Sequence, residues 1–127
     1  MTMTANVARI FEDARLMHNA ALTLMNTGDI RDAAEKAWCA TKRAADGMIT
    51  ARTGEEPPTS AGTSMKLRDL ANTDADVQAL RQTYRERLGT LHGDCFYYGI
   101  CQPIDYIIQL IRESDDFIKE AEQLADA

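Results

Sequence analysis

Three arginines and a histidine lie close together in the second half of the chain: Arg81, Arg85, Arg87 and His92. An imidazole can donate or accept a proton near neutral pH, and a guanidinium can hold phosphate oxygens and offset the charge of a transition state. The group therefore suits chemistry on a phosphodiester and requires no metal for it. The structural alternative is that the arginines are surface charges of a helix and the histidine bonds to a carbonyl at the helix end.

The helical register decides which of these side chains can meet. At about 100° per residue, Arg81, Arg85 and His92 fall within about 40° of one another on one flank of an apolar stripe, where a groove between helices or subunits opens. Arg87 falls on the opposite flank, so in a straight helix it cannot join His92 within one subunit. A distortion at Gly89 would relax that restriction.

Other reactive residue types offer weaker sites. His18 lies on the apolar face of the first predicted helix, where a single histidine is more often an interior residue than a ligand. A set of side chains between positions 92 and 101 has the spacing His-x2-Cys-x5-Cys, which matches no standard zinc arrangement. Motifs for phosphate loops, catalytic serines and zinc proteases do not occur, so we predict no metal and no cofactor.

An aromatic run, Phe96-Tyr97-Tyr98, follows the histidine. Such rings can stack on nucleic acid bases, and they can also anchor the turn before the last helix. In a binding protein we expect Tyr97 to contact the ligand together with Arg81.

Apolar residues recur at three- and four-residue steps along nearly the whole chain, and no alternating run long enough for a strand occurs. This pattern predicts helices from Val7 to Met25, from Asp29 to Ile49, from Met65 to Ala71, from Asp74 to about Leu91, and from about Pro103 onward. Between the first two helices, Gly28 and Asp29 predict a tight turn, so these helices run antiparallel. Residues 54–64, which include Pro57-Pro58, are predicted to form an exposed loop. The expected fold is all-α: one domain over residues 1–127, an up-down antiparallel bundle of four long helices and a short one.

Composition limits the function further. The chain has 127 residues with 14 Lys+Arg and 20 Asp+Glu, a net charge of −6, which disfavours nonspecific coating of duplex nucleic acid. Charge is uneven, however: residues 81–92 hold three Arg and one Glu, whereas residues 105–126 hold seven acidic and two basic residues. Three cysteines without a CxxC pair argue against the disulfide framework of a secreted protein and fit a reducing compartment. No segment predicts a membrane span, so we expect a cytoplasmic protein.

Two segments carry a family resemblance. Gly28-Asp-Ile-Arg-Asp-Ala-Ala-Glu-Lys-Ala-Trp38 and, after the loop, Arg85-Glu-Arg-Leu-Gly-Thr-Leu-His92 resemble the HEPN superfamily of small helical bundles. The box Phe96-Tyr97-Tyr98-Gly99 is similar to that of the archaeal PaREP-type group. The resemblance implies a homodimeric bundle and, in active members, a metal-independent ribonuclease whose Arg and His lie four to six residues apart. Here Arg87 gives Arg-x4-His and Arg85 gives Arg-x6-His.

Departures from the family pattern favour binding over catalysis. Active members commonly carry a polar residue directly after the Arg, whereas Leu88 follows Arg87 and the acidic Glu86 follows Arg85. Many members resemble accessory or nucleotide-binding proteins that act beside a nucleotidyltransferase. We therefore predict a non-catalytic nucleotide- or RNA-binding module. The alternatives are a ribonuclease that uses His92 with Arg85 or Arg87, and a helical interaction scaffold such as a tetratricopeptide array, of which no second repeat is found.

Overall fold

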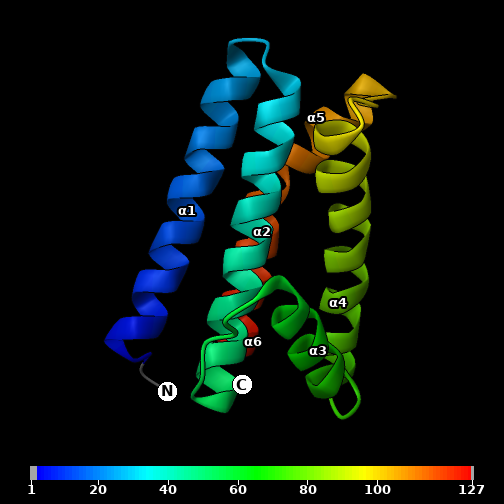
Figure 1. Ribbon diagram of the computed structural model, residues 1–127. Helices are drawn as coiled ribbons and strands as arrows, with labels where there is room; N and C mark the ends of the chain where they lie inside the picture. The colour runs from blue at the N-terminus through cyan, green and yellow to red at the C-terminus, as the bar shows by residue number, and fades with distance from the viewer. Residues whose placement is uncertain (1–2, 127) are drawn as a thin grey trace.

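The structure, a computed structural model, describes residues 3–126, so positions 1, 2 and 127 of the predicted domain lie outside the described residues. The helices are α1 (Ala5–Asn26), α2 (Ile30–Thr53), α3 (Ser60–Ala71), α4 (Ala75–Arg87), the π-helix η1 (Leu88–Tyr97), α5 (Ile104–Arg112) and α6 (Ser114–Ala125). η1 continues α4 without a break, and only Glu113 separates α5 from α6. The elements therefore form four long helical segments, which are α1, α2, α4 with η1, and α5 with α6, together with the short α3 (Figure 1). The predicted all-α antiparallel bundle is confirmed.

The turn between α1 and α2 has the predicted chemistry. Gly28 adopts a left-handed backbone with φ 88°, a conformation that costs glycine little. Asp29 then caps α2, since its carboxylate accepts a hydrogen bond from the backbone N–H of Asp32 at 3.2 Å. The two helices leave this turn side by side and antiparallel (Figure 1).

Helix α2 is the centre of the bundle and contacts every other helix. Its buried face is rich in alanine, which lets neighbouring backbones approach closely. The closest approach is at Gly47, where an added Cβ would lie 2.9 Å from the ring of Phe11 in α1. That ring is 1% exposed, so it has no open space into which to move.

We expect Gly47→Ala to lower the free energy of unfolding by about 1–3 kcal/mol, because the new methyl group overpacks the α1–α2 contact. Gly89→Ala is the matched control: its Cβ meets nothing within 4 Å, so the gain in helix propensity should appear alone. Urea denaturation of both variants checks the prediction. Equal free energies of unfolding for the two variants would contradict the close packing at Gly47.

The predicted loop over residues 54–64 is wrong in its second half. Helix α3 begins at Ser60, five residues before the predicted start at Met65. The Thr59 side chain accepts from the backbone N–H of Gly62 at 3.0 Å and so starts the helix. The hydroxyl of Thr63 then donates to the buried carboxylate of Asp46 at 2.7 Å. A Ser/Thr/Gly-rich composition had suggested a loop, but here it supplies a cap and a buried hydrogen bond.

The fourth helix is longer than predicted. It was expected to end near Leu91, yet it continues through His92 to Tyr97 with the wider i→i+5 bonding of a π-helix. The change of helix type begins at Leu88, beside the predicted distortion point Gly89. Phe96 and Tyr97 therefore belong to a helix end, and the turn comes after them.

Two further expectations need correction. Cys95 and Cys101 are joined by a disulfide, so the odd number of cysteines does not leave all three free; Cys39 is the free one. The last predicted helix is divided at Glu113 into α5 and α6. Between residues 3 and 126, no helix has the length and apolar character needed to cross a membrane.

Candidate functional site

Arg87 lies in the interior of the bundle and is only 1% exposed. Its Nε donates to the hydroxyl of Thr41 at 2.9 Å, and its Nη2 donates to the carbonyl of Leu110 at 2.6 Å and the hydroxyl of Ser114 at 2.5 Å. No carboxylate of residues 3–126 forms an ion pair with it. Burial lowers the pKa of Arg87 to about 10, so the guanidinium remains charged at neutral pH.

This position bears on the Arg-x4-His hypothesis. Arg87 continues the buried row of α4, after Val77, Leu80 and Tyr84, and joins α4 to α2, α5 and α6. Its guanidinium is bound by other groups of the same chain. Among residues 3–126 no hydrogen bond joins Arg87 to His92, as expected from their places on opposite flanks of the helix.

His92 is held by a residue that the sequence reasoning missed. Its Nδ1 lies 2.7 Å from Oε1 and 3.1 Å from Oε2 of Glu35 in α2, so the ring donates from Nδ1 to the carboxylate. The imidazole lies between two aromatic rings, with the centroids of Trp38 and Phe96 each at 6.2 Å. The His92 side chain is 40% exposed, and Nε2 makes no hydrogen bond to the described part of the chain. The only signal for Glu35 was its place in the segment that resembles the HEPN superfamily.

Arg81 and Arg85 lie together on a different cavity. It measures about 190 Å³ and is lined by Ser64, Leu67, Arg81, Tyr84, Arg85 and Leu88, so it lies between α3 and α4. Neither arginine forms an ion pair with a carboxylate of residues 3–126. Burial raises the pKa of the Tyr84 phenol, so this hydroxyl stays protonated at neutral pH.

His92 does not line this cavity, but the two features are neighbours. The ring of Trp38 contacts both Tyr84, at a centroid distance of 5.0 Å, and His92. The predicted flank thus divides in two: Arg81 and Arg85 line the cavity with Tyr84, and His92 is bound to the carboxylate of Glu35. Trp38 contacts Tyr84 in the first group and His92 in the second.

Tyr97 lies at the exposed end of η1 and contacts Tyr98 edge-on, with side chains 67% and 70% exposed. Its backbone carbonyl, like that of Phe96, accepts from the guanidinium of Arg31. Phe96 is the ring of this run that packs inward, against His92. Tyr97 is therefore available to a ligand, but it is not among the residues that line the arginine cavity.

His18 is an interior histidine, as predicted, but it is incompletely hydrogen-bonded. It is 9% exposed and its Nδ1 has no partner within the described chain. Burial lowers its pKa below the ordinary value of 6.5, and the nearby charge of Arg87 acts in the same direction, against the opposing effect of Asp115 and Asp116.

Acidification should therefore destabilise the bundle through His18. The unfolded chain takes up this proton more readily than the folded one, so stability is fully present above about pH 6.5 and declines as the pH falls through that value. Urea unfolding at about pH 7.5 and about pH 5 measures the loss. In His18→Leu the loss should be smaller than in the wild type, and an unchanged loss would assign the acid sensitivity to other groups.

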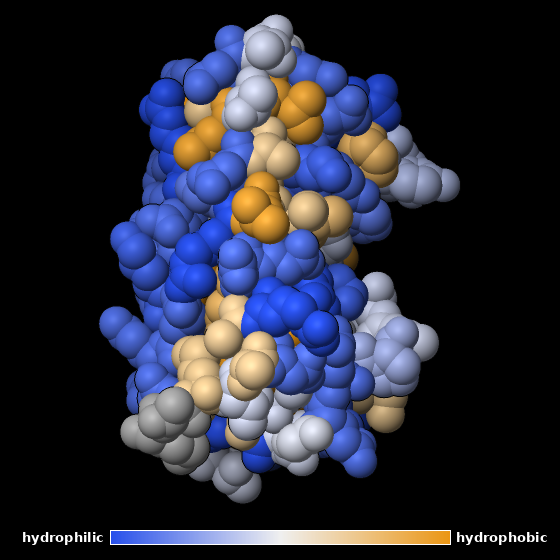
Figure 2. All heavy atoms as spheres, turned by 90° about the vertical axis from the view of Figure 1, so that its left-hand side faces the viewer, coloured by the Kyte–Doolittle hydropathy of each residue, from blue (hydrophilic) through white to orange (hydrophobic). Residues whose placement is uncertain are grey.

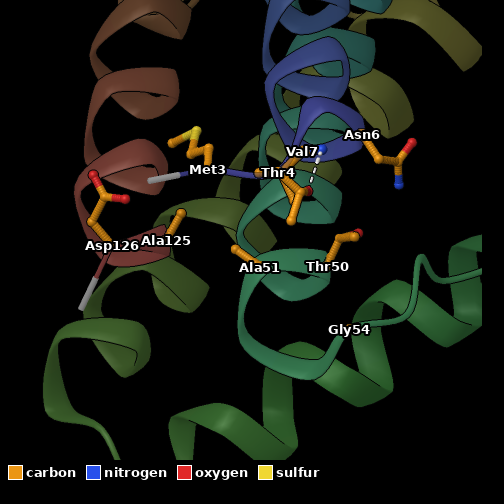
Figure 3. A pocket seen from close by; sticks show the side chains of 9 residues that line it. All are labelled: Met3, Thr4, Asn6, Val7, Thr50, Ala51, Gly54, Ala125 and Asp126. Atoms are coloured by element: carbon orange, nitrogen blue, oxygen red, sulfur yellow. Dashed lines mark hydrogen bonds between the residues drawn. The ribbon is translucent and has the colours of Figure 1, made fainter. Parts of the chain in front are cut away.

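A larger hollow lies at the end of the bundle where α1 begins and α2 and α6 end (Figure 3). It measures about 360 Å³ and is lined by Met3, Thr4, Asn6, Val7, Thr50, Ala51, Gly54, Ala125 and Asp126. Among these only Asp126 can titrate. The hydroxyl of Thr4 already accepts from the backbone of Val7, as the dashed line in Figure 3 marks. This lining offers no arrangement for phosphate chemistry.

The face of α1 carries no continuous apolar surface (Figure 2). Figure 2 shows the face of α1, where apolar residues lie in small patches separated by hydrophilic ones. Among residues 3–126, no three His, Cys, Asp or Glu side chains are grouped so that they could hold a metal ion. The cavity of Arg81 and Arg85 and the Glu35–His92 pair are thus the two candidates for function.

Comparison of the chain with family models, with curated proteins and with solved structures found no match. The functional assignment therefore depends on the geometry described above and on the sequence resemblance.

Proposed function

We propose that the protein is a HEPN-like helical module that binds a phosphate group of RNA or of a nucleotide in the cavity of Arg81 and Arg85, without cleaving the ligand. One observation carries this proposal: Arg81 and Arg85, neither of which pairs with a carboxylate of residues 3–126, line a single cavity together with Ser64 and Tyr84. Phosphate oxygens accept hydrogen bonds from guanidinium and hydroxyl groups. The confined site also agrees with a net charge of −6, which repels nucleic acid elsewhere.

One contact set supports binding over catalysis. Arg87, one of the two arginines at the family spacing, is bound inside the fold by Thr41, Leu110 and Ser114. In this proposal the protein acts as a homodimer and an accessory partner, for which a nucleotidyltransferase is the candidate that the family resemblance suggests. A purely structural interaction scaffold is the alternative in which Arg81 and Arg85 only keep the bundle soluble.

The salt dependence of RNA affinity tests the proposal. Fluorescence anisotropy with an end-labelled single-stranded RNA should give saturable binding, with log K falling against log salt at a slope of about −0.7 for one neutralised phosphate on a single strand. The RNA should be recovered at full length. Lack of saturable binding at low salt would contradict the proposal and leave the scaffold alternative.

A metal-independent ribonuclease remains the second candidate, and the Glu35–His92 contact is the observation in its favour. A carboxylate at Nδ1 fixes the ring and leaves Nε2 for proton transfer to or from a ribose hydroxyl. In this mechanism the 2′-hydroxyl attacks the adjacent phosphorus and leaves a cyclic phosphate, so DNA is not cut.

Cleavage of RNA in excess chelator is the test of the second candidate. Activity that is lost in His92→Ala and reduced in Glu35→Gln would establish the ribonuclease and overturn the non-catalytic proposal. RNA that stays intact with the wild-type protein, under conditions where it binds, would exclude the ribonuclease.

A further inference from the structure

A disulfide closes a short loop at the end of η1. Cys95 and Cys101 are joined, and residues 96–100 between them are called the 96–100 loop below. Cys95 is fully buried in the core, whereas Cys101 is half-buried in the segment that leads to α5. The bond therefore connects a core position of the helix to a connecting segment at the surface.

The 96–100 loop is fixed at one end and open at the other. Arg31 of α2 holds the carbonyl of Phe96 through Nε at 3.1 Å and Nη2 at 2.7 Å. Beyond that anchor, Tyr97, Tyr98 and Ile100 are 67%, 70% and 58% exposed. The backbone N–H of Ile100 donates to the carbonyl of Asp94 at 2.7 Å, and the disulfide follows at the next residue. Arg31 also donates to the carbonyl of Tyr97 at 3.2 Å and lies against Gly99. The exposed side chains of Tyr97, Tyr98 and Ile100 are thus held through the backbone, by Arg31, a few backbone hydrogen bonds and the disulfide.

The bundle itself does not depend on this bond. A chain of 127 residues buries enough surface to fold without a covalent link, and Cys95 packs among apolar residues of the core. Breaking the disulfide leaves a buried thiol at Cys95, which behaves as a small apolar side chain. Cys101, which is partly buried against the core, then loses its covalent link, and the exposed half of the loop loses one of its restraints.

We infer that Cys95 and Cys101 form a reversible thiol–disulfide switch, which orders the exposed half of the 96–100 loop when oxidised and frees it when reduced. This inference does not depend on the proposed RNA binding. The co-reactant is a small disulfide such as glutathione disulfide. The more accessible Cys101 thiolate attacks one of its sulfurs and releases one thiol; the Cys95 thiolate then attacks Sγ of Cys101 and releases the second. Two protein thiols become one disulfide, one small disulfide becomes two thiols, and the two protons pass to the released thiolates.

Cys39 lies in α2, outside the disulfide, and is the free cysteine. The oxidised protein should therefore contain one titratable thiol, that of Cys39.

Thiol counting and limited proteolysis of the full-length chain test the switch. After treatment with glutathione disulfide, denatured protein should titrate one thiol, and after treatment with a phosphine reductant it should titrate three. Chymotrypsin, which cuts after exposed aromatic residues, should cleave native reduced protein after Tyr97 or Tyr98 at least about tenfold faster than oxidised protein. Cys101→Ser should be cut at the fast rate under both conditions, and Cys39→Ser should retain the difference.

Cleavage after the buried Phe11 provides the control for folding. If reduction or Cys101→Ser unfolded the whole bundle, cutting at Phe11 would rise together with cutting at Tyr97, and the local switch would be overturned. Three titratable thiols after oxidation, or equal cleavage rates in the two redox states, would also overturn it.

Discussion

Replacement of Arg87 by alanine is expected to lower the free energy of unfolding by about 2–5 kcal/mol. The substitution removes a fully buried side chain and leaves the Thr41 hydroxyl, the Leu110 carbonyl and the Ser114 hydroxyl without their donor. It also leaves a cavity where four helices meet. Urea denaturation followed by circular dichroism measures the effect.

Two variants serve as controls for this prediction. Arg87→Met fills the same space with an apolar chain and should cost less than the alanine variant, because buried charges can often be replaced by apolar residues of similar size. Arg85→Ala removes an exposed arginine two residues away and should change stability by no more than about 0.5 kcal/mol. A stable Arg87→Ala protein that loses RNA binding would contradict the structural role of Arg87 and place it in the functional site.

The double substitution Arg81→Ala/Arg85→Ala is expected to weaken RNA binding at least about tenfold at low salt and to flatten its salt dependence. Both guanidiniums that line the cavity are then absent, while the packing of Tyr84 and Leu88 is retained. Anisotropy titrations of labelled single-stranded RNA at several salt concentrations give affinity and slope together.

The matched control for the double variant is Arg9→Ala/Arg112→Ala. This pair lies on α1 and α5, is exposed, and changes the net charge by the same amount. It should retain most of the affinity and the slope of the wild-type protein. Equal losses in the two double variants would show that overall charge alone governs binding, and would contradict a built site at Arg81 and Arg85.

Local signals in the sequence were sufficient for much of the fold. The Gly28–Asp29 turn could be predicted because a left-handed glycine and an N-cap affect only the few residues next to them in the chain. The start of α3 could not, because Thr63 is stabilised by Asp46, which lies 17 residues earlier in the chain. Serine, threonine and glycine suit both loops and helix starts, so only the tertiary partner distinguishes the two.

The positions of the basic residues could be predicted only in part. The helical register correctly placed Arg87 on another flank than Arg81 and Arg85. The groups that accept hydrogen bonds from Arg87, however, lie on α2, α5 and α6, and their convergence is a property of the whole fold. The contact between Glu35 and His92 joins residues 57 positions apart and has no periodic signal. The disulfide was missed for a similar reason: a count of cysteines says nothing of how the end of η1 brings two of them together.

Nuclear magnetic resonance titration of the labelled protein with a short single-stranded RNA tests the central proposal most directly, because it locates the phosphate. We expect saturable shifts of the Arg81 and Arg85 guanidinium signals and of the Ser64 and Tyr84 backbone amides, with RNA that stays at full length in the presence of chelator. Shifts confined to Glu35 and His92, together with shortened RNA, would contradict the account and identify the protein as a ribonuclease.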